Sequence, residues 1–142
     1  MPSIPIASTN ASPLSQSILV VEDESIIREL LCEVLEIEGY TTLPMENADL
    51  ALAYMEVHFL EIALLLTDIN MPGVINGAEL ANTSNGLWPS IPVVVMSGFE
   101  TLASAGIHSG ALFVGKPFTM DQMMTGIRAA LDERLPVQKA LH

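Results

Sequence analysis

The chain of 142 residues is 50% hydrophobic, and 17 acidic residues against 5 Lys and Arg give it a formal net charge of −12. One domain of this length can bury a sizeable core, and a surface this acidic disfavours direct contact with nucleic acid or anionic membranes. No apolar run reaches the roughly 18 residues that a membrane span needs, and the lone cysteine, Cys32, excludes an internal disulfide and fits a reducing cytoplasm.

Apolar segments of strand length alternate along the chain with segments of helical periodicity. Residues 1–16 are rich in Ser, Pro, Ala and Thr, and we expect a disordered leader that is not a signal peptide. The expected strands span 17–21, 40–43, 62–67, 91–96 and 111–115. The expected helices span 25–38, 47–59, 77–88, 101–108 and 119–134.

Turn and cap residues support most of these limits. Gly39 is a natural stop for the first helix, and Pro44 ends the second strand. Asn47 can cap the second helix, and Thr119 begins a capping box at the last one. The third helix contains the poor helix-forming run Asn-Thr-Ser-Asn-Gly at 82–86, so we expect it to be short or irregular.

The alternation predicts a single doubly wound α/β domain over 17–134, a (βα)5 fold with a five-stranded parallel sheet and helices on both faces. The flavodoxin-like strand order 2-1-3-4-5 places the first and third strands side by side, and ligands bind such sheets at the carboxyl ends of the strands. The tail at 135–142 is too short to form a second domain.

Polar and charged side chains stand where four of the expected strands end. Asp68 closes the third strand before a Pro-Gly turn, and Glu22 and Asp23 come directly after the first strand. Ser97 ends the fourth strand, and Lys116 follows the fifth. Parallel strands bring these side chains to one edge of the sheet.

The chemistry of this set suits a cation and a phosphoryl group. Three carboxylates this close need a cation, and oxygen ligands suit Mg²⁺, with the backbone carbonyl of Asn70 as one more oxygen. Lys116 offers a positive charge to a phosphoryl oxygen or to the Asp68 carboxylate, and Ser97 offers a hydroxyl donor. These residues favour attack of a carboxylate on phosphorus to give an acyl phosphate, which depends on positioning and charge neutralisation.

Four segments carry a resemblance to a known family. They span 19–24, 66–73, 94–98 and 113–118, and read LVVEDE, LTDINMPG, VVMSG and FVGKPF. In this order and at this spacing, they make residues 17–134 resemble a response-regulator receiver domain of two-component signalling. Each segment alone is a weak signal, and the four together are specific.

The resemblance implies that Asp68 is the phosphoacceptor, loaded by a histidine kinase or a histidine phosphotransfer protein. It also implies that Glu22, Asp23 and Asp68 bind Mg²⁺ together with the backbone carbonyl of Asn70.

The same resemblance implies a conformational switch. Ser97 and Phe113 would be the switch residues, and Lys116 the family's lysine, with a cis bond to Pro117. Phosphorylation would then reshape the face formed by the fourth helix, fifth strand and fifth helix, where a partner protein would bind.

Some positions depart from the family pattern. The loop at 72–77 is one residue longer than the commonest form and lacks the usual acidic residue before Gly77. Phe99 is a bulky neighbour of Ser97, and Gly115 is a flexible neighbour of Lys116.

We therefore expect a cytoplasmic, stand-alone receiver, monomeric or weakly dimeric, that acts as a shuttle, a phosphate sink or a kinase regulator without a DNA-binding output domain. It would not be an enzyme beyond self-catalysed phosphotransfer and autodephosphorylation. One alternative is a pseudo-receiver that binds partners without phosphorylation. Another is an aspartate-nucleophile phosphatase, which would carry a second acid where this chain has Asn70.

Overall fold

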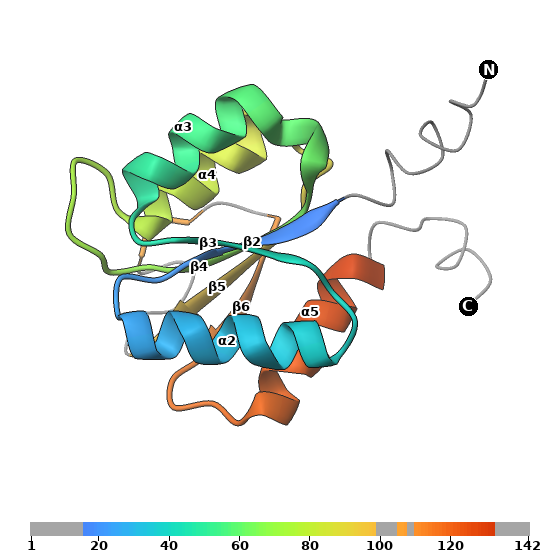
Figure 1. Ribbon diagram of the computed structural model, residues 1–142. Helices are drawn as coiled ribbons and strands as arrows, with labels where there is room; N and C mark the ends of the chain where they lie inside the picture. The colour runs from blue at the N-terminus through green and yellow to red at the C-terminus, as the bar shows by residue number, and fades with distance from the viewer. Residues whose placement is uncertain (1–15, 99–104, 108–109, 133–142) are drawn as a thin grey trace, which may run out of the picture.

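The computed structural model describes residues 16–98, 105–107 and 110–132 as one α/β unit (Figure 1). Five parallel strands form a single sheet in the order β3-β2-β4-β5-β6. Helices α3 and α4 cover one face of this sheet, and α2 and α5 cover the other. The doubly wound fold and the expected strand order are therefore confirmed.

The strands and helices lie close to their expected positions. The strands are β2 (Ser17–Val21), β3 (Thr42–Met45), β4 (Ile62–Asp68), β5 (Val93–Ser97) and β6 (Ala111–Gly115). The helices are α2 (Ser25–Ile37), α3 (Ala48–His58), the 3-10 turn η1 (Phe59–Glu61), α4 (Gly77–Leu87) and α5 (Met120–Asp132).

Strand β3 begins and ends two residues later than expected, and Pro44 lies inside it. The strand is at the edge of the sheet and pairs only with β2, so a residue without an N–H is tolerated there. Tyr40, expected in the strand, instead finishes the preceding helix: its N–H donates to the carbonyl of Leu35 over 3.1 Å. Gly39 makes this reversal at φ +103°, as its position at the end of the helix predicted.

Helix α4 is an unbroken helix of 11 residues, so the expectation of a short or irregular helix was wrong. A capping box between Asn76 and Glu79 starts the helix, with both hydrogen bonds at 2.9 Å. Its polar residues are used in tertiary packing: the Asn82 side chain donates to the Gly106 carbonyl over 2.8 Å, and Ser84 is fully buried. These contacts stabilise α4 despite the low helix propensity of its residues.

The helix expected at 101–108 lies mostly outside the described residues. In its described part, residues 105 and 106 form a turn and residue 107 has no regular secondary structure. Two caps were predicted correctly: the Asn47 side chain accepts from the N–H of Leu50, and the Thr119 hydroxyl accepts from the N–H of Gln122. The part of the chain that the structure describes contains no helix long and apolar enough to cross a membrane.

The core lies in two layers, one on each face of the sheet. In β4, Leu64 and Leu66 pack with α2 and α5, whereas Leu65 packs with α3 and α4. A strand with leucine on both faces is fully buried, as a central parallel strand must be. This burial fixes the carboxyl end of β4, where Asp68 stands.

Candidate functional site

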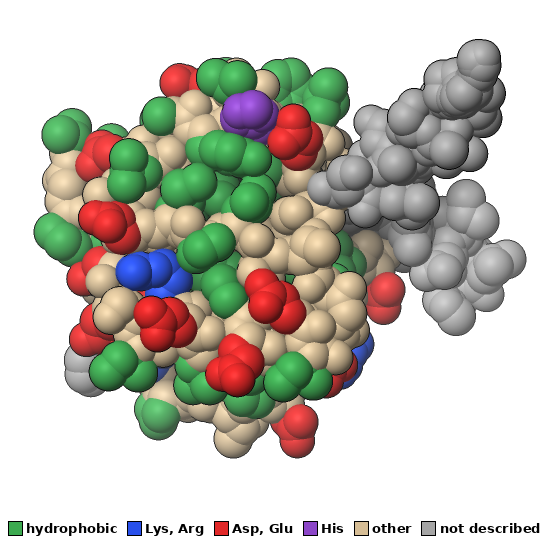
Figure 2. All heavy atoms as spheres, in the orientation of Figure 1, with side chains coloured by type: hydrophobic (Ala, Val, Ile, Leu, Met, Phe, Trp, Pro, Cys, Tyr) green, Lys and Arg blue, Asp and Glu red, His purple; other side chains and the backbone are tan. Residues whose placement is uncertain are grey.

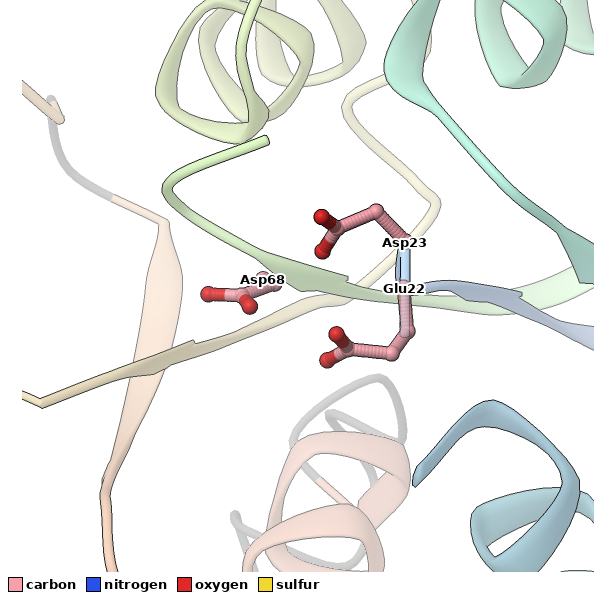
Figure 3. Close-up of side chains that lie close together, drawn as sticks. All are labelled: Glu22, Asp23 and Asp68. Atoms are coloured by element: carbon pink, nitrogen blue, oxygen red, sulfur yellow. The ribbon is translucent and has the colours of Figure 1, made fainter. Parts of the chain in front are cut away.

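Three carboxylates meet at the carboxyl ends of β2 and β4. Glu22 and Asp23 follow β2, and Asp68 is the last residue of β4; Val21 and Thr67 just before them are register partners. One carboxylate oxygen from each of the three lies within 4.8 Å of the others. Figure 3 shows Asp23 and Glu22 extending from opposite sides of the same chain segment, with both carboxylates directed toward Asp68. The convergence predicted from the sequence is therefore present.

The Glu22 side chain is held in place from several directions and is fully buried. Its Oε2 accepts from the N–H of Glu24 over 3.2 Å, and its backbone carbonyl accepts from Nη1 of Arg28 over 2.7 Å. Its second oxygen, Oε1, has no hydrogen-bond partner. A buried carboxylate oxygen that accepts no hydrogen bond is costly in a protein and fits a site for a cation.

Burial raises the pKa of the Glu22 carboxyl from 4.5 to about 7, and the nearby negative charge of Asp68 adds to this effect. The backbone N–H of Glu24 and the charge of Lys116 oppose it. Without a cation, therefore, the protonated form of Glu22 competes with the ionised form at neutral pH.

Lys116 reaches this cluster from the loop after β6. Its Nζ donates to Oδ2 of Asp68 over 2.8 Å and lies 3.9 Å from Oε1 of Glu22. Its backbone N–H donates to the carbonyl of Ser97 over 2.7 Å, and its bond to Pro117 is cis, as the resemblance implied.

The pKa of the Lys116 ammonium is set by opposing effects. Burial lowers it, but the hydrogen bond to Asp68 and the charges of Asp68 and Glu22 outweigh burial and raise the pKa above 10.5. The side chain is therefore a permanent positive charge beside Asp68.

The remaining predicted residues lie around the same edge. Ser97 is buried at the end of β5, one position beyond Met96, the register partner of Asp68. Phe113 lies on β6 and is half-buried, and its ring packs over Gly115. Asn70 is exposed and follows β4 after one intervening residue.

Two supports of Asp68 were not predicted from the sequence. The Thr67 hydroxyl donates to the Asp68 backbone carbonyl over 2.9 Å. On the other side, Gly77 packs so closely that a β-carbon there would overlap the same carbonyl oxygen. The sequence signal for Gly77 was only a glycine at the start of a helix, and its role depends on the fold of the loop before it.

A hollow of about 480 Å³ borders the cluster on its exposed side. Asp23 and Arg28 line it from the loop after β2 and from α2, and Pro72 and Gly73 line it from the loop between β4 and α4. The acidic cluster is thus reachable by a reactant from solvent.

Comparison with known proteins gives a consistent match. A sequence model described as the response regulator receiver domain matches residues 18–128. The nitrogen assimilation regulatory protein NtrX of Azorhizobium caulinodans is 35% identical over 123 residues, which cover 84% of this chain and 27% of that protein. The chain spans about a quarter of the length of NtrX and of another similar regulator, the C4-dicarboxylate transport regulatory protein DctD of Rhizobium meliloti.

Solved structures match in the same way. A CheY-like receiver domain protein from Methanospirillum hungatei JF-1 superposes with a TM-score of 0.75 at 29% identity, over 84% of this chain and 95% of that one. NtrX from Brucella abortus, crystallised with ATP, superposes with a TM-score of 0.75 at 32% identity, over 89% of this chain and 29% of that one.

Proposed function

Because this chain belongs to the response-regulator receiver domain family, we propose that it accepts a phosphoryl group on Asp68 in a two-component or phosphorelay pathway. The observation that carries the proposal is the position of Asp68 between opposite charges. Its Oδ2 accepts from Nζ of Lys116 over 2.8 Å, and carboxylate oxygens of Glu22 and Asp23 lie within 4.8 Å of its own.

The residues at this edge fit Mg²⁺. The buried Oε1 of Glu22, which accepts no hydrogen bond, and the oxygen-only donor set fit this hard cation. Glu22, Asp23 and Asp68 would hold the ion, and the backbone carbonyl of Asn70 would supply one more oxygen. When bound, Mg²⁺ would neutralise negative charge on the phosphoryl group and on the carboxylates around it.

The protein's own residues supply the rest of the chemistry. An oxygen of Asp68 forms a bond to phosphorus as the bond from phosphorus to the donor breaks, and the donor leaves with the bonding electrons. Lys116 then pairs with a phosphoryl oxygen, and the Ser97 hydroxyl donates to another. We assign Ser97 and Phe113 as the switch residues: Ser97 ends β5, and Phe113 lies on the adjacent strand β6, two residues before Gly115, the register partner of Ser97.

The phosphoryl donor would be a protein that carries phosphohistidine, a histidine kinase or a histidine phosphotransfer protein. The output would be contact with another protein through the surface of β6, α5 and the segment between β5 and β6. In the view of Figure 2, acidic side chains are spread over the surface and basic ones are few, which disfavours direct binding to nucleic acid.

Two alternatives predict different chemistry. An aspartate-nucleophile phosphatase needs a general acid near its nucleophile, and Asn70 occupies the position where such enzymes carry it. A pseudo-receiver would bind partners without phosphorylation; the charged set around Asp68 favours the phosphoacceptor instead.

Phosphorylation with a small donor tests the proposal directly. The protein is incubated with acetyl phosphate and Mg²⁺, and intact mass spectrometry looks for one added phosphoryl group. The addition should require Mg²⁺ and should disappear in Asp68→Asn, while Asp121→Asn, at an exposed aspartate of α5, should label like the wild type. An unlabelled wild type supports the pseudo-receiver, and rapid turnover of a phosphomonoester supports the phosphatase.

A further inference from the structure

The loop that follows the phosphoacceptor is tied to a helix that carries none of the predicted site residues. Asp49, in the first turn of α3, accepts two backbone hydrogen bonds from this loop. The N–H of Val74 donates to Oδ2 over 2.9 Å, and the N–H of Ile75 donates to Oδ1 over 3.3 Å. Both carboxylate oxygens are therefore used by one loop.

The fit between this carboxylate and the loop is close. Gly73 has φ +138°, and a β-carbon at this position would overlap Oδ2 of Asp49. Val74 is 90% exposed, so its side chain contributes little packing that could hold the loop. Met71 and Ile75 pack against the core on the α3 and α4 face of the sheet, and the exposed backbone between them, at Gly73 and Val74, is shaped around the Asp49 carboxylate.

The other end of the loop is fixed at the active site. The N–H of Gly77 donates to the carbonyl of Ile69 over 2.8 Å, which closes the loop beside Asp68. Asn70 lies between this closure and the segment held by Asp49. The same segment contributes Gly73 to the hollow next to Asp23, so its position also sets one wall of the entrance.

We propose that Asp49 is a positioning residue for phosphoryl transfer: its carboxylate holds the loop at 70–76 and thereby fixes the Asn70 carbonyl and the entrance beside Asp68. The expected effect on phosphorylation rests on the proposed function. The claim that Asp49 holds the loop at 70–76 does not depend on it. A carboxylate is suited to this role because hydrogen bonds from N–H groups to an ionised acceptor are stronger than those to a neutral one.

Two variants at position 49 and one matched control test the role. Asp49→Ala removes both acceptors, and Asp49→Asn keeps one carbonyl oxygen but places an amide N–H₂ against the other backbone N–H. Asp121→Ala removes the equivalent first-turn aspartate of α5, which is exposed, and so controls for the loss of charge at a helix N-terminus.

Four measurements are made on the 142-residue chain and on each variant of it. They are amide hydrogen exchange at Val74 and Ile75, Mg²⁺ affinity by titration, the rate of Asp68 labelling by acetyl phosphate, and the melting temperature. In Asp49→Ala, we expect faster exchange at both amides, and a loss of about 10-fold or more in Mg²⁺ affinity and labelling rate. Asp49→Asn should lie between Asp49→Ala and the wild type, and Asp121→Ala should match the wild type in exchange, affinity and labelling.

Several outcomes would overturn the inference. Wild-type Mg²⁺ affinity in Asp49→Ala would do so, as would losses in labelling no larger than those of Asp121→Ala at an equal change in melting temperature. If Asp49→Ala does not fold, Asp49→Asn decides by the same criteria. If the wild type takes no label, the proposed function fails, while the exchange rates and Mg²⁺ titrations still decide whether Asp49 holds the loop.

Discussion

Gly77, the first residue of α4, packs directly against the backbone carbonyl of Asp68, and its N–H donates to the carbonyl of the next residue, Ile69. Asp68, the proposed phosphoacceptor, is therefore supported by a helix N-terminus that has no side chain at the point of contact. The space that a single methyl group would need is already filled by the Asp68 oxygen.

A methyl group at this point should damage both stability and the site. We expect Gly77→Ala to lower the free energy of unfolding by at least about 2 kcal/mol, since the helix or the end of β4 must move. Gly86→Ala is the matched control on the same helix, because nothing lies within 4 Å of its β-carbon; it should raise stability by about 0.5–1 kcal/mol. Urea unfolding of both variants measures the difference, and equal stabilities would contradict the close contact at Gly77.

Much of this architecture was readable from the sequence because strands and caps leave local signals. The apolar run before Asp68 and the acids after the first strand predicted two neighbouring strand ends, and the cap at Asn47 follows from its side chain alone. The Asp49 contact could not be predicted in this way. Its partners are backbone N–H groups 25 and 26 residues away, and a backbone N–H is the same in almost every residue.

The errors have a related cause. Proline predicts the end of the second strand at Pro44, but a strand at the edge of the sheet needs no donor on its outer side. The low helix propensity of residues 82–86 predicts a short or irregular helix, but tertiary contacts such as the hydrogen bond from Asn82 to the Gly106 carbonyl stabilise α4. In both cases the local structure is determined by contacts with residues that are distant in the sequence, and local propensity carries no information about those contacts.

The raised pKa of Glu22 predicts how the stability of metal-free protein depends on pH. The folded-state pKa of about 7 exceeds the unfolded value of 4.5, so the folded state binds the proton more tightly. Protonation of Glu22 therefore makes its full contribution to the free energy of unfolding below about pH 4.5. This contribution, roughly 3 kcal/mol at most, is lost as the pH rises through 7.

Replacing the carboxyl with a neutral amide should remove this dependence. In EDTA, Glu22→Gln should gain stability relative to the wild type between pH 5 and pH 8, as followed by thermal melting in matched buffers. Glu79→Gln controls for loss of an acid elsewhere, since Glu79 is exposed in the α4 capping box. If the melting temperatures of the wild type and of Glu22→Gln change in parallel with pH across this range, the Glu22 pKa is not raised.

Lys116 predicts opposite effects on metal binding and on phosphorylation. Lys116→Met removes a positive charge 2.8 Å from Oδ2 of Asp68, so we expect tighter Mg²⁺ binding, because repulsion between the two cations is lost. The rate of Asp68 labelling should nevertheless fall about 100-fold, because the variant loses a charge that stabilises the phosphoryl oxygens. Arg128→Met, which removes an exposed cation of α5 paired with Glu38, is the control for net charge.

These two quantities are measured by Mg²⁺ titration and by the time course of acetyl phosphate labelling. Weaker Mg²⁺ binding in Lys116→Met would mean that the ammonium mainly holds Asp68 in place. A labelling rate equal to that of Arg128→Met would mean that Lys116 has no part in the transfer.

Ser84 in α4 gives a stabilising substitution that should leave the function intact. It is fully buried, and its Oγ has no hydrogen-bond partner, so the hydroxyl is desolvated without compensation. Ser84→Ala should raise the free energy of unfolding by about 1 kcal/mol, from this term and from higher helix propensity. Thr83→Ala, on the same helix but only half-buried, should gain from propensity alone.

The difference between these two variants isolates the buried hydroxyl. Since α4 supports Asp68 through the backbone at Gly77, a substitution in its third turn should leave the Asp68 labelling rate unchanged while the urea midpoint rises. If Ser84→Ala is instead less stable than Thr83→Ala, the hydroxyl must have a bonding partner such as a buried water. If the labelling rate falls, the packing of α4 is coupled to the geometry of Asp68 over the length of the helix.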